Sequence, residues 1–423
     1  MIQTALIPNA HNDLVTDAAY DFYGLHLATC SLDQRIKIWQ LDERNGTWSA
    51  EDDWKAHDAA ITKLSWAHPE FGTILASSSF DRTVKIWEQT SYSDADSQAN
   101  GASGLSLNSR WVERASLIDA KGTVRGVEFA PQHFGLKLAT ISSDNHLRVY
   151  ECLEQPSLST WQLCEEVDVL SLPSTSPGGH SMPQTVTQVT PTQTSSTLEG
   201  ASAALAAHVA TQQQQSQPPN RPGLGTREAD GGWCISWCKD RYWGEIIAAS
   251  CGVNGIVKII QLSPSRRPIT LLTLDPTPSS DAPPRSPAAE GEAPTYYSTT
   301  SVAWAPSCGR SYQLIATGSR DGHVRIWRVK PPSAEDEFDS GESDGREEAW
   351  TATIVGDFDD HKAAVGRVEW NITGTILSSA GSDGRVRLWK ATAGNVWRPA
   401  GHISVEQAEE QQDVDMNDDP SAD

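Results

Sequence analysis

Three sets of side chains in this sequence combine a histidine, a hydroxyl residue and an aspartate, the residue types that enzymes use for acid–base and nucleophilic chemistry. One set is His57, Ser77 and Asp81. Similar sets, in the same order, lie near both ends of the chain. Three matched copies indicate a recurring element of structure and not three active sites. The other two sets are His11, Thr29 and Asp33, and His361, Ser379 and Asp383.

No other motif in the sequence predicts catalysis. The glycine-rich segments 318–322 and 381–384 do not open a helix after a strand, as a phosphate-binding loop does. Signatures of hydrolases, zinc proteases and kinases are missing from the sequence. Cys234 and Cys238 have no second pair of ligands nearby, so a zinc site is not expected. We predict that the protein is not an enzyme and has no cofactor, metal or small-molecule substrate.

The elements that carry these residues are copies of one strand–turn–strand unit. Residues 75–88, LASSSFDRTVKIWE, contain a hydrophobic run, a tight turn at Asp81 and an alternating strand that ends at Trp87. In every copy the turn residue is Asp or Asn, and a Ser or Thr lies four positions before it. The turn residues are Asp33, Asp81, Asp144, Asn254, Asp321 and Asp383, and the strands end six positions later at Trp39, Trp87, Tyr150, Ile260, Trp327 and Trp389.

This unit resembles the WD40 repeat, whose four-stranded blades build a β-propeller. The resemblance implies that the His, Ser or Thr, Asp and Trp of a blade form a hydrogen-bonded cluster that ties its strands together. The middle blades lack the His, and the fourth also lacks the Asp and the Trp. We therefore predict an all-β, six-bladed, open propeller with long disordered insertions and an acidic tail. The residues expected in these structural clusters are His11, Thr29, Asp33, Trp39, His57, Ser77, Asp81, Trp87, Asp144, Tyr150, Asp321, Trp327, His361, Ser379, Asp383 and Trp389.

The repeats divide the chain into a propeller at 1–403 and several insertions. We expect blades at about 11–54, 57–90, 111–161, 233–274, 299–330 and 350–397. The Ser/Pro/Gln-rich insertion 171–230 and the acidic tail 404–423 have too little apolar surface to fold and are predicted to be disordered. A Pro-rich loop is expected at 275–294 and an acidic loop at 331–349.

The charge of the chain is negative and unevenly placed. The formal net charge is −22, and much of it lies in the acidic loop and the tail. Because direct binding to nucleic acid draws on clustered Lys and Arg, we expect no nucleic-acid partner. No run approaches the roughly 18 apolar residues of a membrane span, and the N-terminus lacks the pattern of a secretory signal. We expect a soluble, intracellular protein.

The resemblance is closest to the WD40 nucleoporins of the Seh-one type, which are similar to Sec-thirteen. It is carried by residues 11–39 and 65–88, by FAPQHFGLKLAT at 129–140, and by WNITGTILSSAGSDGRVRLWKA at 370–391. It implies a scaffold subunit of the Y-shaped subcomplex of the nuclear pore. It also implies membership of a nutrient-signalling complex that regulates the TOR kinase, peripheral to the vacuole or lysosome membrane. The expected partners are other scaffold nucleoporins, subunits of that vacuolar complex, and a nucleoporin of the Nup-eighty-five type that donates a blade.

Six blades are fewer than the seven common in WD40 propellers, so an incomplete ring would leave strand edges open to addition. Ile2, Thr4 and Leu6 lie on an apolar N-terminal run and are candidate partner contacts. Three alternatives stay open. They are a self-closed ring of six blades, a vesicle-coat propeller of the Sec-thirteen type, and a substrate receptor of a cullin ubiquitin ligase. The blade ends lack the Trp-Asp-x-Arg motif of many such receptors.

Overall fold

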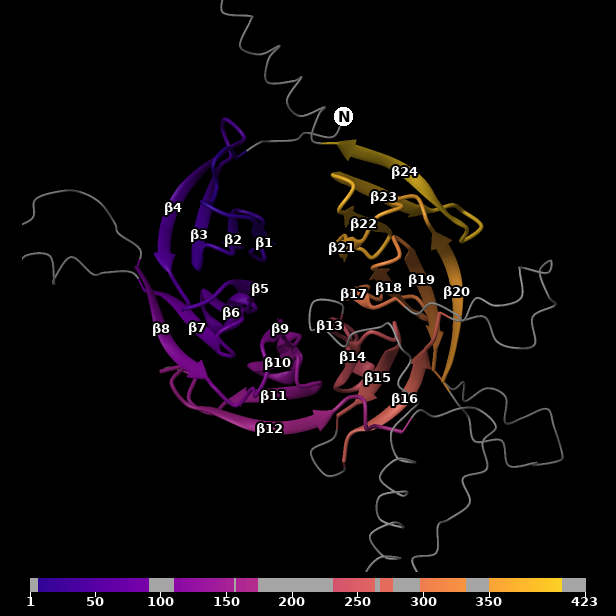
Figure 1. Ribbon diagram of the computed structural model, residues 1–423, viewed down its shortest axis with the longest axis horizontal. Coiled ribbons are helices and arrows are strands. Elements are labelled where there is room, and N and C mark those ends of the chain that lie inside the picture. Colours follow the sequence, from indigo (N-terminus) through magenta and orange to yellow (C-terminus); the bar gives the residue numbers. More distant parts are fainter. Residues whose placement is uncertain are drawn as a thin grey trace, which may run out of the picture. The chain divides into compact units, whose positions relative to one another are not determined.

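The computed structural model describes residues 7–90, 110–155, 157–173, 231–262, 267–276, 297–331 and 350–404. In these residues the regular elements are β-strands and three single-turn 3₁₀ helices. The strands form six four-stranded antiparallel sheets, each made of strands that are consecutive in the chain. Figure 1 shows these sheets as blades around a common centre. The prediction of an all-β propeller with six blades is confirmed.

The first three blades share one order of strands, from the innermost at the centre to the outermost at the rim (Figure 1). Blade one consists of β1 (Val15–Tyr20), β2 (His26–Ser31), β3 (Arg35–Asp42) and β4 (Thr47–Lys55). Blade two consists of β5 (Ile61–Trp66), β6 (Ile74–Ser79), β7 (Val84–Thr90) and β8 (Arg110–Leu117). Blade three consists of β9 (Val124–Phe129), β10 (Lys137–Ser142), β11 (His146–Cys152) and β12 (Trp161–Asp168).

The last three blades repeat that order. Blade four consists of β13 (Gly232–Trp237), β14 (Ile246–Gly252), β15 (Val257–Gln261) and β16 (Ile269–Leu274). Blade five consists of β17 (Thr299–Trp304), β18 (Gln313–Ser319), β19 (Val324–Lys330) and β20 (Thr351–Phe358). Blade six consists of β21 (Val365–Trp370), β22 (Ile376–Gly381), β23 (Arg385–Ala391) and β24 (Trp397–Ser404). The short helices are η1 (Pro69–Phe71), η3 (Gln132–Phe134) and η5 (Arg241–Trp243), each between the first two strands of its blade.

The turn between the second and third strands explains why every copy carries Asp or Asn. The side chain accepts a hydrogen bond from the backbone N–H two residues later, as Asp81 does from Thr83 at 2.9 Å. The residue between them adopts a positive φ, which is 70° at Arg82 and 68° at Gly255. Asp and Asn are suited to such turns because their short side chains replace a backbone acceptor. The same bond forms at Asp33, Asp144, Asn254, Asp321 and Asp383.

Five apolar clusters hold the described part of the chain together, one between each pair of consecutive blades. Each third strand points two apolar side chains toward the next blade, as Val324 and Ile326 of blade five do toward Val365 and Val368 of blade six. Both Val324 and Ile326 are fully buried. None of the five clusters joins blade six to blade one.

Several blade boundaries differ from those predicted from the sequence. Blade three was expected to end at about 161, but β12 extends it to Asp168. Residues 111–117 were expected to open blade three, but they lie in β8, which pairs with β7 and completes blade two. Residues 351–358 were expected to open blade six, but they lie in β20 and pair with β19 of blade five. In both cases a long segment separates the outermost strand from its own blade, so the strand reads along the chain as part of the next repeat. Ser404, expected in the tail, is the last residue of β24.

Several sequence predictions lie outside the described residues. They concern Ile2, Thr4 and Leu6 at the N-terminus, most of the insertion 171–230, most of the Pro-rich loop 275–294, the acidic loop and the acidic tail. Residues 171–173 of the insertion are described and follow β12 directly.

Candidate partner-binding site at the junction of the first and sixth blades

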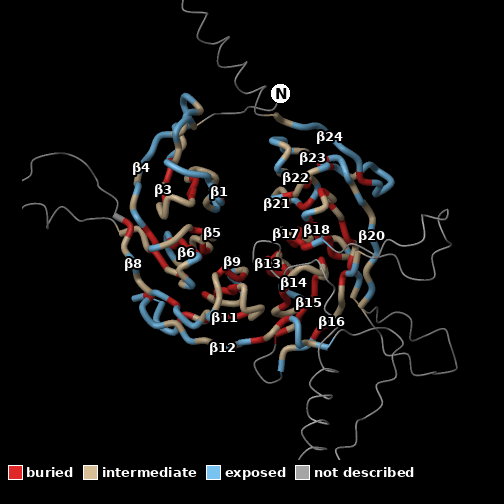
Figure 2. The backbone as a smooth tube through the Cα atoms, viewed as in Figure 1, coloured by how far each residue is buried: buried red, intermediate tan, exposed pale blue. Residues whose placement is uncertain are grey.

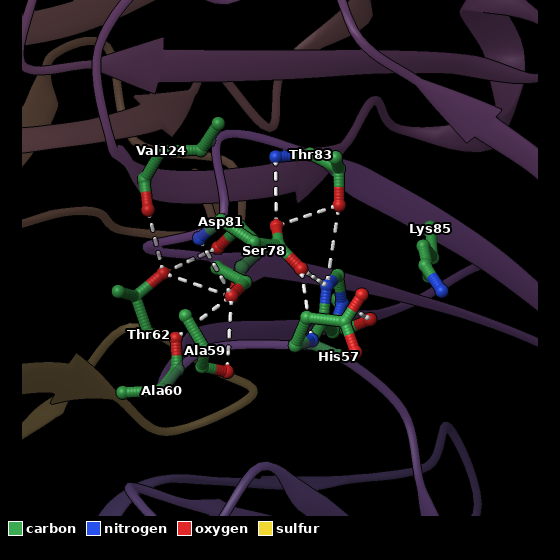
Figure 3. Close-up of polar contacts among 12 residues, drawn as sticks. His57, Ala59, Ala60, Thr62, Ser78, Asp81, Thr83, Lys85 and Val124 are labelled. Carbon is green, nitrogen blue, oxygen red and sulfur yellow. Dashed lines mark hydrogen bonds and ion pairs between the residues drawn. The ribbon is translucent and has the colours of Figure 1, made fainter.

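In blade two the residues of the predicted cluster are joined by hydrogen bonds, and His57 and Ser77 each take part in two of them. His57 contacts Asp81 through Nδ1 at 2.8 Å and Ser77 through Nε2 at 2.7 Å. Trp87 donates its indole N–H to the Ser77 hydroxyl at 2.9 Å. Thr83 donates to the Asp81 carboxylate, and Figure 3 shows His57, Asp81 and Thr83 in one group. The contacts join the loop before β5 to the turn and to two strands of the blade.

Electrostatics within this cluster favour a charged Asp81. Burial alone would raise its pKa, but hydrogen bonds from His57 and Thr83 outweigh that effect and hold the pKa well below its usual range. Ser77 has no exposed surface. A hydroxyl that is fully buried and already bound by an indole N–H cannot meet a substrate, so the geometry favours a structural role.

Blades one and six contain the same set of contacts. His11 contacts Asp33 at 3.0 Å and Thr29 at 2.9 Å, and Trp39 donates to Thr29 at 2.9 Å. In blade six, His361 contacts Asp383 at 3.0 Å and Ser379 at 2.8 Å, and Trp389 donates to Ser379 at 2.8 Å. The complete set predicted for blades one, two and six is therefore brought together in each of them.

In blade three the predicted pair is not brought together. Asp144 accepts hydrogen bonds from Ser142 at 2.5 Å and from Arg148 at 2.8 Å. The Tyr150 hydroxyl donates instead to Asp119 at 3.1 Å. Burial is the main cause of the raised pKa of Tyr150, and the Asp119 carboxylate raises it further. Tyr150 thus anchors the loop between β8 and β9 to its blade.

Blade five also divides its predicted pair between two separate contacts. Asp321 binds Ser319 and, at 3.2 Å, Arg325. Trp327 donates to Thr317 at 3.1 Å. An arginine four residues after the turn therefore takes the place of the missing histidine, as in blade three.

The basic residue four positions after the turn is the main structural feature that the sequence did not predict. In blades one, two, three and five its side chain pairs with an acid on the outermost strand of the same blade, as Arg148 does with Glu166 at 2.8 Å. Its signal was present, because a Lys or Arg lies four residues after the turn in all six copies. The six residues are Lys37, Lys85, Arg148, Lys258, Arg325 and Arg387.

Lys258 differs from the others because its ammonium group binds the preceding blade. It donates to the carbonyl oxygens of Val169 at 2.8 Å, Leu170 at 3.3 Å and Leu172 at 2.5 Å. Burial lowers its pKa. Lys258 therefore fixes the residues that follow β12 against blade four.

Blade six presents to blade one the face that is buried in every other blade. The third-strand residues Val386 and Leu388 occupy the positions of Val324 and Ile326 in blade five. Val386 is 37% exposed, and Leu388 is partly exposed. The equivalent pairs of blades one to five are no more than 2% exposed. The strands show the same contrast, because every residue of β18 in blade five is buried, whereas β22 and β23 of blade six are mostly intermediate or exposed (Figure 2).

Blade one presents the opposite wall of this junction. Val15 and Tyr20 lie on β1 at the positions that Val124 and Phe129 occupy on β9. Val15 is 49% exposed and Tyr20 60%, whereas Val124 and Phe129 are buried. The Tyr20 ring contacts the Trp48 ring, with centroids 5.7 Å apart. Among the described residues, the junction therefore has apolar side chains on both walls and no shared buried cluster between them.

Arg367 on β21 reaches across this junction near the centre. Its guanidinium pairs with Asp17 on β1 and donates to the carbonyl oxygen of Ala18 at 2.8 Å. Asp17 also accepts from Lys63 at 3.0 Å and from the backbone N–H of Leu64 at 3.0 Å. The innermost ends of blades one and six are thus linked by a polar contact, while their apolar faces remain apart.

The described residues contain no group of three or more His, Cys, Asp or Glu arranged to hold a metal ion. Cys234 and Cys238 are buried free thiols, and burial raises the pKa of each to about 12. In the part of the chain that the structure describes, no helix is long and apolar enough to cross a membrane.

Comparison with known proteins shows which protein family this chain belongs to. Residues 3–40, 49–88, 295–328 and 352–390 match the family model described as WD domain, G-beta repeat. The chain is 33% identical to nucleoporin SEH1 of Saccharomyces cerevisiae, over 94% of this chain and 99% of that protein. It is 30% identical to nucleoporin seh1 of Schizosaccharomyces pombe, over 97% and 98% of the two chains. For human nucleoporin SEH1 the identity is 31%, over 92% and 85%. Similarity at this level and over this length shows that the chain is a WD40-repeat protein of the nucleoporin SEH1 family.

Proposed function

We propose that the protein is a non-enzymatic scaffold subunit of the Y-shaped subcomplex of the nuclear pore, and that a partner nucleoporin completes its propeller by donating a blade. The nuclear pore role is supported by the names of its relatives. The absence of catalysis is supported by the burial of the histidine–hydroxyl–aspartate clusters. Such a protein acts by holding other subunits in a fixed arrangement.

The observation that carries the blade donation is the pair of exposed apolar walls at the junction. Val386 and Leu388 on one side, and Val15 and Tyr20 on the other, occupy positions that a neighbouring blade covers elsewhere in the ring. Covering them would remove apolar surface from water, which stabilises the complex by roughly 25 cal/mol for each Å² buried. A foreign sheet offers both the strands and the apolar side chains that this requires, and a nucleoporin of the Nup-eighty-five type is the proposed donor.

The same junction would serve a second assembly. We include membership of the vacuole- or lysosome-associated complex that regulates TOR signalling, where the protein would be peripheral to the membrane. That part of the proposal rests on the resemblance to Seh-one proteins. A subunit with one open junction binds one blade at a time, so the two assemblies would contain separate copies of the protein.

Hydrogen exchange on the full-length chain tests the blade donation. The probe is the N-terminal segment of the Nup-eighty-five-type nucleoporin from the same organism, added at increasing concentration. We expect slower exchange at 15–20 and 365–390 and a rise in the melting temperature, because a ligand that binds the folded state stabilises it by mass action. Unchanged exchange at both walls with the partner bound elsewhere would refute the donated blade and leave a surface-docked scaffold.

Affinity purification with mass spectrometry tests the assembly itself. Recovery of scaffold nucleoporins together with the partner supports the nuclear pore role, and recovery of vacuolar signalling subunits supports the second assembly. Recovery of vesicle-cage proteins, or of a cullin ligase, would support the corresponding alternative instead.

A further inference from the structure

We propose that Glu369 recognises the innermost strand of the donated blade. We infer that this strand carries a Trp, with a Ser or Thr four residues before it and a Lys two residues after it. The inference rests on the proposed donation of a blade and names the chemistry of the segment that fits. It follows from contacts that recur between the innermost strands at the closed junctions.

The first recurring contact is an indole hydrogen bond to the preceding blade. The Trp near the end of an innermost strand donates to the carbonyl oxygen of the residue just before the corresponding aromatic of the preceding blade. The carbonyl that occupies this position at the open junction belongs to Glu369, the residue before Trp370. The three closed examples are Trp66 to Ala19 at 2.9 Å, Trp237 to Glu128 at 3.1 Å and Trp370 to Ala303 at 3.0 Å.

The second contact joins the backbone N–H of that aromatic residue to a side chain of the preceding blade. The accepting side chain belongs to the residue just before the corresponding aromatic of the preceding blade. At the open junction this side chain is the carboxylate of Glu369. The three closed examples are Phe129 to Ser65 at 3.0 Å, Trp237 to Glu128 at 3.2 Å and Trp304 to Ser236 at 3.1 Å.

Glu128 shows what an acid does at this position. Its carboxylate accepts the backbone N–H of Trp237 and also pairs with Lys239, which lies two residues after Trp237, just past the end of β13. The side chain of Glu128 is 21% exposed, and that of Glu369 is 61% exposed. Glu128 and Glu369 are the acids among the six equivalent residues, which are Ala19, Ser65, Glu128, Ser236, Ala303 and Glu369. A matching Lys on the donated strand would be favoured by the same charge.

The third contact points from an innermost strand to the following blade. A threonine four residues before the aromatic donates its hydroxyl to the carbonyl oxygen of the first residue of the next innermost strand. For a blade placed between six and one, the acceptor would be the carbonyl of Val15. The closed examples are Thr16 to Ile61 at 2.7 Å, Thr62 to Val124 at 2.8 Å, and Thr300 to Val365.

Arg367 lies between these acceptors in the free protein. Its Nε is 3.2 Å from the Glu369 carboxylate, and its Nη1 binds Ala18 of blade one. A strand that enters between β21 and β1 must displace this side chain from blade one. The Lys of the incoming strand then takes over part of the charge pairing at Glu369, while Asp17 keeps Lys63 and the backbone N–H of Leu64.

Titration calorimetry of the full-length chain against the partner segment used above tests this proposal. The variants are Glu369→Gln and Glu369→Ala, with Glu70→Gln as the matched control, because Glu70 is an exposed acid on η1 of blade two. We expect Glu369→Ala to weaken binding roughly tenfold, the effect of losing a charge-assisted contact. Glu70→Gln should bind as the wild type does. Since Glu369 is exposed, unchanged melting temperatures of the free variants check that folding is intact.

The partner side of the contact gives an independent readout. Replacing the predicted partner Lys by Met should weaken binding, and combining it with Glu369→Ala should cost less than the sum of the two changes. Wild-type affinity for Glu369→Ala, with 365–370 still protected on binding, would overturn the role of Glu369 and leave the donated blade intact. A partner strand that protects both walls without the Trp, the hydroxyl residue and the Lys would overturn the predicted pattern. Failure of the wild-type protein to bind through this junction would overturn the proposed function itself.

Discussion

The junction between blades five and six and the junction between blades six and one are built from the same strand pattern, but only the first is packed. Val324 and Ile326 of blade five are completely buried against blade six. Their counterparts Val386 and Leu388 have no blade of the described chain packed against them and remain partly exposed. The apolar alternation of a WD40 strand therefore specifies a face to be covered, and whether it is covered depends on the neighbouring blade.

The largest difference between the two junctions is expected for the aromatic residue that ends an innermost strand. Phe129→Ala, at a closed junction, should lower the free energy of unfolding by about 3–5 kcal/mol, because it leaves a cavity in a packed cluster. Tyr20→Ala, at the equivalent position of the open junction, should cost about 1 kcal/mol or less in the free protein, because that ring is mostly exposed. Urea denaturation of both variants measures the two values.

Equal losses for Phe129→Ala and Tyr20→Ala would contradict the comparison and indicate a ring that closes on itself in solution. A matched control is Phe129→Leu, which keeps most of the apolar contact and should lose much less stability than the alanine variant.

The sixth-blade wall should show a similar but smaller contrast. Ile326→Ala should cost roughly 3 kcal/mol, since it removes fully buried methyl groups, and Leu388→Ala about 1 kcal/mol. Saturation with the partner segment should increase the cost of Leu388→Ala and leave that of Ile326→Ala nearly the same. Thermal unfolding with and without the partner provides the measurement. If the loss of stability caused by Leu388→Ala is the same with and without the partner, the donated blade does not cover this wall.

The pH dependence of stability in blade six reports on contacts within one blade, in contrast to the contacts between blades considered above. Burial alone would raise the pKa of Asp383, but hydrogen bonds from His361 and Arg387 lower it to about 2. An unfolded aspartate titrates near pH 3.9. The stabilisation from Asp383 is therefore fully present above about pH 4 and is lost as the pH falls toward about 2.

Asp383→Asn should accordingly be less stable than the wild type at neutral pH, and the difference should shrink between about pH 4 and pH 2. Urea unfolding across this range measures it. Because the cluster lies within one blade, the profile should be the same with the partner bound. A difference that stays constant down to pH 2 would show that the His361 and Arg387 contacts do not act on the carboxylate.

Local features of the fold could be predicted from the sequence, and features that depend on pairing between blades could not. The turn at Asp81 was predictable because its side chain bonds a backbone N–H only two residues away. The place of β8 in blade two was not, since its partner β7 lies beyond a long segment with no turn motif. The candidate site divides in the same way. The incomplete ring follows from the number of repeats, whereas Glu369 is singled out only by the register between innermost strands.

Arg148 and Lys258 occupy a position whose residue type recurs in the sequence but whose contacts depend on the fold. Both stand four residues after the turn residue, where all six copies have a base. Their different partners could not be read from that spacing. Arg148 finds Glu166 on the outermost strand of its own blade, while Lys258 reaches three carbonyl oxygens of blade three.

The smallest effect is expected for the insertion in the sequence between blades three and four. Replacing 174–230 by a short Gly/Ser linker should change the free energy of unfolding by no more than about 0.5 kcal/mol, because the length of a surface loop affects its closure entropy only weakly. Residues 171–173 must stay, since Leu172 offers a carbonyl oxygen to Lys258. Replacing 171–230 instead also removes the Leu172 side chain, which packs against the cluster between blades three and four, and should cost roughly 1 kcal/mol more. Lys258→Met in both backgrounds completes the comparison. If the shorter replacement alone destabilised the protein strongly, the segment would have to pack on the propeller and add to its core. If both replacements behaved alike, the native residues 171–173 would contribute nothing to holding the two blades together.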